Sequence, residues 1–138
     1  MNRTDLQQLA ELRLEDARVL FQNDRYSGAY YLCGYAVECA LKACIALQIR
    51  QHEYPPRRNF SNDLFSHDLN RLASLAGLDL VLATSKRANS TFAANWSEIE
   101  KWSEDSRYET WTMQEAQQLL DAVGQVPDGV LAWIRQHW

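Results

Sequence analysis

Apolar and small side chains recur in steps of three and four from residue 25 to residue 50, and no proline interrupts them. This spacing predicts a long helix with a broad apolar stripe. Many of its other positions are small too, including Gly28 and Gly34, so we expect other helices to pack closely against several of its faces. Its two polar interruptions, Glu38 and Lys42, are four residues apart with the acid first, the favourable order for a helical ion pair.

A second amphipathic pattern precedes it, from about Thr4 to Gln22. Thr4 followed by Gln7 has the spacing of a capping box, which predicts the start of this helix. The break at residues 23–24 is short, and so brief a connection favours an antiparallel hairpin of the first two helices.

The helical pattern stops after residue 50, where two adjacent prolines and two arginines fall in a stretch without period. We expect a loop over residues 51–63. Loops of this length in a compact domain are often functional. Its basic side chains are His52, Arg57 and Arg58. One interpretation is a phosphate-binding or partner-binding loop, and the other is a solvated loop without a ligand.

Ser66 has the position of a helix cap, with Asp68 in the first turn and Gly77 at the end of the helix. His67 would then lie at the helix N-terminus, where backbone N–H groups can bind phosphate. A structural hydrogen bond is the alternative role for this histidine. The sequence therefore identifies His67 as a candidate ligand-binding residue.

Residues 81–101 predict one or two shorter helices, with a helix start at Asn95. The polar segment after them has no period, and we expect it to cross the bundle and to present Arg107 and Tyr108. A capping box at Thr112 predicts the start of the final helix. The apolar phase continues past Pro127, which predicts a kinked helix or two nearly collinear helices broken around residues 124–127. The tryptophan-rich end must be buried against the bundle or against a partner.

These elements predict an all-α fold, an antiparallel up-and-down helical bundle with a long central second helix, in a single domain over residues 1–138. Burial of Glu38 beside Arg107 would give a charge-assisted bond that ties the late segment to the central helix. Glu38, Lys42, Arg107 and Tyr108 are therefore predicted to be structural polar anchors, in preference to catalytic groups.

Composition limits which ligands and cofactors the protein is expected to bind. The net charge is −4 and the pI is about 5.3, so the overall field repels a phosphate backbone. Cys33 and Cys44 lie on one face of the predicted helix and are predicted to be core residues, and the histidines form no cluster of metal-ligand spacing. The cysteines are Cys33, Cys39 and Cys44, and the histidines are His52, His67 and His137. No metal, cofactor, signal sequence or membrane span is indicated, and we expect a cytoplasmic protein.

The stretch RYSGAYYLCGYAVECALKACI resembles the central helix of the HEPN (higher eukaryotes and prokaryotes nucleotide-binding) domain family. SHDLNRLASLAGL and SRYE are similar to a helix start and an Arg-Tyr element found in many bacterial members. The resemblance extends from about Leu14 to Trp138. It implies a helical bundle, frequent dimerisation, and association with minimal nucleotidyltransferases or other defence and toxin–antitoxin components.

Many members of that family are metal-independent ribonucleases that use an arginine and a histidine with four to six residues between them. No histidine here follows an arginine at that spacing. The leading hypothesis is therefore a noncatalytic interaction module that forms a homodimer and partners a nucleotidyltransferase-like protein or another toxin–antitoxin or defence component. One alternative is a ribonuclease in which His67 meets Arg57, Arg58 or Arg107 in space, and another is a nucleotide-binding module that uses the basic loop.

Overall fold

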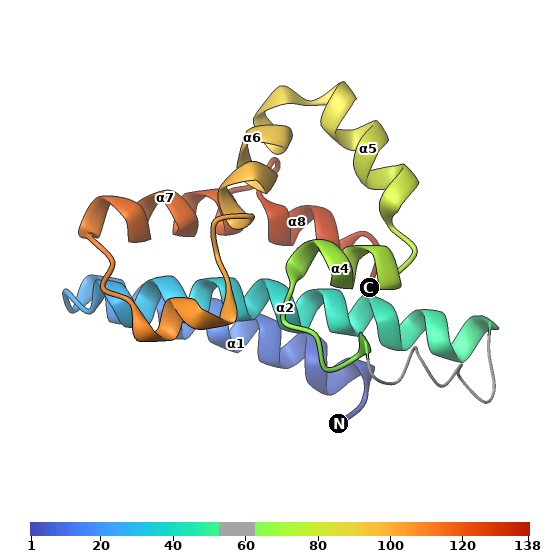
Figure 1. Cartoon of the computed structure of the whole chain (residues 1–138), viewed down its shortest axis with the longest axis horizontal. Helices are drawn as coiled ribbons and strands as arrows, with labels where there is room; N and C mark the ends of the chain where they lie inside the picture. The colour runs from blue at the N-terminus through green and yellow to red at the C-terminus, as the bar shows by residue number, and fades with distance from the viewer. Residues whose placement is uncertain (53–62) are drawn as a thin grey trace.

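A computed structural model describes residues 1–52 and 63–138, and these residues form helices and no strand (Figure 1). The all-α prediction is confirmed. The elements are α1 (Arg3–Gln22), α2 (Tyr26–His52), α4 (Leu69–Leu75), α5 (Asp79–Ala88), α6 (Ser90–Ile99), the 3₁₀ helix η1 (Glu104–Tyr108), α7 (Met113–Gly124) and α8 (Val130–Arg135). The predicted basic loop starts too early, because α2 continues to His52. Its residues 53–62, with Arg57 and Arg58, lie outside the described residues.

The helix α2 is the centre of the fold, and α1, α4, α7, α8 and η1 all contact it. Figure 1 shows α1 antiparallel to α2 on one side, while α7 and α8 run along another. Its buried side chains occupy every face of the helix, as the small residues predicted. They are Ala29, Tyr30, Cys33, Ala36, Val37, Glu38, Cys39, Ala40, Leu41, Ala43, Cys44 and Ile45. Over Tyr26–Ile49 the helix is long and apolar enough to cross a membrane, a test that the buried core helix of a bundle also passes.

The hairpin of α1 and α2 is confirmed, but the predicted cap of α1 is wrong. The helix begins at Arg3, so Asn2 is the N-cap and forms a reciprocal capping box with Asp5. Thr4 therefore lies inside the first turn, where it cannot serve as a cap. At the other end, Asp24 adopts a left-handed φ of 61°, which aspartate tolerates better than most residues and which reverses the chain tightly.

Two further helix starts differ from the prediction. The N-cap of α4 is Asp68, whose side chain accepts from the Arg71 N–H, while Ser66 Oγ accepts from the Asp68 N–H. Residues 81–101 fall in two helices, and α6 starts after Asn89. Asn95 lies within α6 and donates to the Asp128 carbonyl, so its amide serves a tertiary contact.

The C-terminal prediction is confirmed in both parts. Thr112 and Glu115 form the capping box of α7, and the helix stops at Gly124 before α8 begins at Val130. Trp133 is buried within the chain, with its ring 5.2 Å from Phe92 and 5.8 Å from Trp96. The apolar payload at this end is thus largely covered by the bundle itself.

One glycine of α2 determines how the segment after α6 approaches the central helix. A Cβ added at Gly34 would overlap Cδ1, Cδ2 and Cε2 of Trp102, so the indole lies directly on the helix backbone. The indole Nε1–H also donates to the Tyr31 carbonyl at 3.2 Å. Because Gly34 has no side chain, Trp102 can pack on the α2 backbone there, and this contact anchors the start of the η1 segment.

We predict that Gly34→Ala lowers the free energy of unfolding by about 1–3 kcal/mol, because the added methyl displaces a buried indole. Gly28→Ala is the matched control on the same helix. Its added Cβ would meet one flexible atom, Leu20 Cδ1, at 3.3 Å, and alanine favours a helix over glycine by about 0.5–1 kcal/mol. Chemical denaturation measures the free energy of unfolding of both variants. Equal losses of stability would contradict the role of Gly34 in packing Trp102.

Candidate functional site

Glu38 is a carboxylate buried in the middle of α2, with 2% of its surface exposed. Its Oε1 accepts from Lys42 Nζ at 2.8 Å, which confirms the predicted ion pair. The same oxygen lies 3.0 Å from His67 Nδ1. A buried charge is costly unless it is paired and hydrogen-bonded, and these two partners meet that requirement.

The predicted contact between Glu38 and Arg107 is wrong. His67 occupies the position beside Glu38, because the segment that leads into α4 crosses α2 there. Arg107 instead pairs with Glu104 on its own turn of η1, with Nη2 3.3 Å from Oε1. The prediction thus paired Arg107 with Glu38 on α2, whereas its acidic partner is Glu104 on η1.

Glu104 connects the two candidate residues that the sequence left apart. His67 Nε2 lies 3.4 Å from Glu104 Oε2, while the other oxygen of this carboxylate faces Arg107. Five side chains therefore form a chain of contacts from α2 to η1, which we call the His67 network. Its members are Lys42, Glu38, His67, Glu104 and Arg107. The sequence analysis missed Glu104, although its position three residues before Arg107 is typical of an ion pair within one helical turn.

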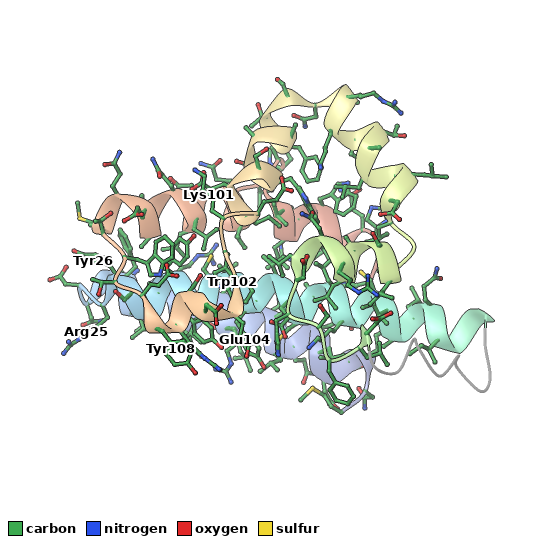
Figure 2. All side chains as sticks on the ribbon, viewed as in Figure 1. Arg25, Tyr26, Lys101, Trp102, Glu104 and Tyr108 are labelled. Atoms are coloured by element: carbon green, nitrogen blue, oxygen red, sulfur yellow. The ribbon has the colours of Figure 1, made fainter. Side chains whose placement is uncertain are left out.

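The segment around η1 is fixed at both ends by tryptophans. Trp102 lies on Gly34, and Trp111 stacks on Tyr30 with 3.7 Å between ring centroids. The Trp111 backbone N–H donates to Ser27 Oγ, so the chain returns to the start of α2. Figure 2 shows Trp102, Glu104 and Tyr108 along this stretch, where it passes across α2. The two anchors hold the acidic and basic groups of η1 beside the central helix.

A cavity of about 410 Å³ opens beside His67, between the start of α4 and the start of η1. Trp102 and Ile99 supply part of its apolar wall. Four of its lining residues are acidic, namely Asp68, Glu100, Glu104 and Asp105, whereas Arg107 is not among the residues that line it. This concentration of negative charge favours a cationic ligand over phosphate.

The cysteines do not contribute nucleophiles. All three are free and buried, which confirms the core role predicted for Cys33 and Cys44 and adds Cys39 to the core. Burial raises the pKa of the Cys39 thiol to about 11 and that of Cys44 to about 12, so both remain protonated near neutral pH. Thiolate chemistry, which needs a lowered pKa, is therefore absent from these sites.

In residues 1–52 and 63–138, no group of three or more His, Cys, Asp or Glu side chains is arranged to hold a metal ion. His137 is not among the residues that line the cavity, and its ring centroid lies 4.6 Å from that of Trp133, where burial lowers its pKa. His67 is thus the histidine that the described structure places beside a cavity. Arg57 and Arg58 lie outside the described residues.

We predict that Glu38→Ala lowers the free energy of unfolding by about 1–3 kcal/mol, because His67 and Lys42 lose a buried acceptor. Glu98→Ala provides the comparison, since Glu98 bonds Lys101 at 2.9 Å within one turn and Lys101 is 64% exposed. Loss of that surface pair should cost less than about 1 kcal/mol. Denaturation curves that place the two variants together would show that Glu38 does not anchor the site.

A search for similar proteins gives a single kind of match. The HEPN domain family matches residues 4–133, nearly the whole chain. No curated protein and no solved structure matches. The match covers both the central helix and the segments that carry His67 and Arg107, the parts from which the resemblance was first inferred. The chain therefore belongs to the HEPN domain family.

Proposed function

We propose that this HEPN domain is a noncatalytic interaction module that forms a homodimer and partners a nucleotidyltransferase-like protein or another toxin–antitoxin or defence component. The observation that carries the proposal is the set of four acidic residues that line the cavity beside His67. A nuclease that acts on a phosphodiester needs positive charge where the phosphate lies. Here Asp68, Glu100, Glu104 and Asp105 line the cavity beside the histidine.

The arginine that could offset this charge is already engaged. Arg107 pairs with Glu104, and its guanidinium lies 4.7 Å over the ring of Tyr108. The net charge of −4 adds to the unfavourable field for nucleic acid. Family membership supports a protein partner, since the resemblance to HEPN domains implies association with minimal nucleotidyltransferases or other defence and toxin–antitoxin components.

The C-terminal tryptophans were expected to supply a dimer surface, but Trp133 is buried within its own chain. Support for a dimer comes instead from η1. Tyr108 is a large aromatic side chain that is 76% exposed, and Arg107 covers one face of it. Tyrosine and arginine are enriched at the energetic centres of interfaces. Glu104, Asp105 and Glu109 lie on the same turn or next to it, so the patch carries both signs of charge. A patch of this kind can be complementary to itself across a twofold axis.

We predict that the wild-type protein is a dimer in sedimentation velocity and light scattering, and that Tyr108→Ala weakens dimerisation at least about tenfold, or 1.4 kcal/mol. Leu80→Ala is the control, because Leu80 is 86% exposed on α5. A monomer at every concentration would overturn the homodimer. A dimer that both variants leave intact would move the interface away from η1.

A ribonuclease is the second candidate, and one observation favours it. Buried Glu38 fixes His67 through Nδ1, which leaves Nε2 toward Glu104 and the cavity, as in sites where a carboxylate orients a catalytic histidine. His67 would be the general acid or base and Arg107 the phosphate-binding group.

Incubation of the purified protein with total RNA distinguishes the two candidates. The noncatalytic proposal predicts no cleavage by the wild-type protein. Cleavage that falls about 10²–10⁴-fold in His67→Ala, and that His137→Gln leaves unchanged, would replace it with the ribonuclease. A nucleotide-binding role for the basic loop is a further alternative, which ATP or GTP titration by calorimetry tests.

A further inference from the structure

We propose that His67 is a proton-linked clasp: its imidazolium form ties η1 to α2 through Glu104, and its neutral form releases the Glu104 side chain. The proposal goes beyond dimerisation and partner binding, because it is a property of a single chain. It rests on the positions of both ring nitrogens, each of which faces a carboxylate oxygen.

The count of hydrogen-bond donors on the ring gives the reason. Nδ1 lies 3.0 Å from Glu38 Oε1, and Nε2 lies 3.4 Å from Glu104 Oε2. An imidazolium has an N–H at both nitrogens, whereas a neutral imidazole has one. When the ring is protonated, Nδ1–H donates to Glu38 and the positive ring forms an ion pair with Glu104 across 3.4 Å. In the neutral ring, one nitrogen lone pair must face an anionic oxygen.

The burial of the two acids decides which contact is lost. The Glu38 side chain is 3% exposed, so the proton that remains on the neutral ring belongs on Nδ1. The Glu104 side chain is 38% exposed and has Arg107 as a second partner at 3.3 Å. Glu104 can therefore turn toward solvent and Arg107 without leaving a buried charge. Deprotonation opens the outer contact and preserves the inner one.

Acids outnumber basic groups around the ring. In the described structure the charged groups are Glu38 and Lys42 on α2, Glu104, Asp105 and Arg107 on η1, Glu100 after α6, and Asp68 beside His67 itself. Five of these seven groups are acids, Lys42 is bonded to Glu38, and Arg107 pairs with Glu104. Trp102 and Trp111 hold the ends of the segment independently. Release should thus loosen the first turn of η1 and the mouth of the cavity while the bundle remains folded.

Amide hydrogen exchange, measured by NMR and corrected for the intrinsic effect of pH, tests the clasp. The probes are the Ser106 and Glu109 amides, which bond the Ser103 and Ser106 carbonyls. As the pH rises and the NMR signal of the His67 ring changes to that of its neutral form, we expect their protection to fall several-fold with the same midpoint. No such change is expected at the Ala116 amide, whose bond to Thr112 lies in α7.

Glu104→Gln is the decisive variant, because a neutral amide can accept from the imidazolium or donate to the neutral ring. His67 should still titrate in this variant, while the protection of the two η1 amides becomes independent of pH. His67→Gln should also abolish the dependence, and His137→Gln should retain it. Protection that does not follow His67 in the wild-type protein, or that follows it equally in Glu104→Gln, would overturn the proposal.

Discussion

A carboxylate buried in the middle of an apolar helix must be paired, and Glu38 imposes this requirement on its surroundings. Lys42 can satisfy it in part from the same helix, since it is one turn away. The second partner, His67, comes from a distant segment, so the chain before α4 must lie against α2. Leaving such a charge unpaired would cost several kcal/mol, comparable to a large share of a small domain's stability. The polar residue thus selects one docking position along a helix whose apolar surface alone would allow several.

Close packing at Gly34 supplies the complementary constraint. The Trp102 ring lies against the helix backbone there, and Trp111 stacks on Tyr30 nearer the start of α2. Between these two anchors the chain has to follow α2, which brings Glu104 within reach of His67. An apolar seat and a buried charge therefore fix the same segment from two sides. The His67 network depends on both, because its outer half is carried by η1.

Local patterns in the sequence predict the elements better than their long-range contacts. The spacing of apolar residues identified α2, and the order of Glu38 and Lys42 identified their bond, since both depend on neighbours one turn apart. Choosing between His67 and Arg107 as the second partner of Glu38 needs the paths of two segments across α2. No local pattern encodes those paths. The predicted cap at Asn95 failed for a related reason: asparagine is a good cap at either Asn89 or Asn95, and the contact of Asn95 with Asp128 is tertiary.

The acids around His67 also bear on how a family scaffold can host different roles. A histidine that serves a phosphodiester must approach an anion, so its own charge and that of its neighbours should be positive in sum. His67 lies between two carboxylates, and with the ring protonated the five groups of the His67 network, three cations and two carboxylates, sum to only +1. Further acids line the adjacent cavity. An environment of this kind repels phosphate, which favours a role for His67 in holding η1 over a role in cleaving RNA.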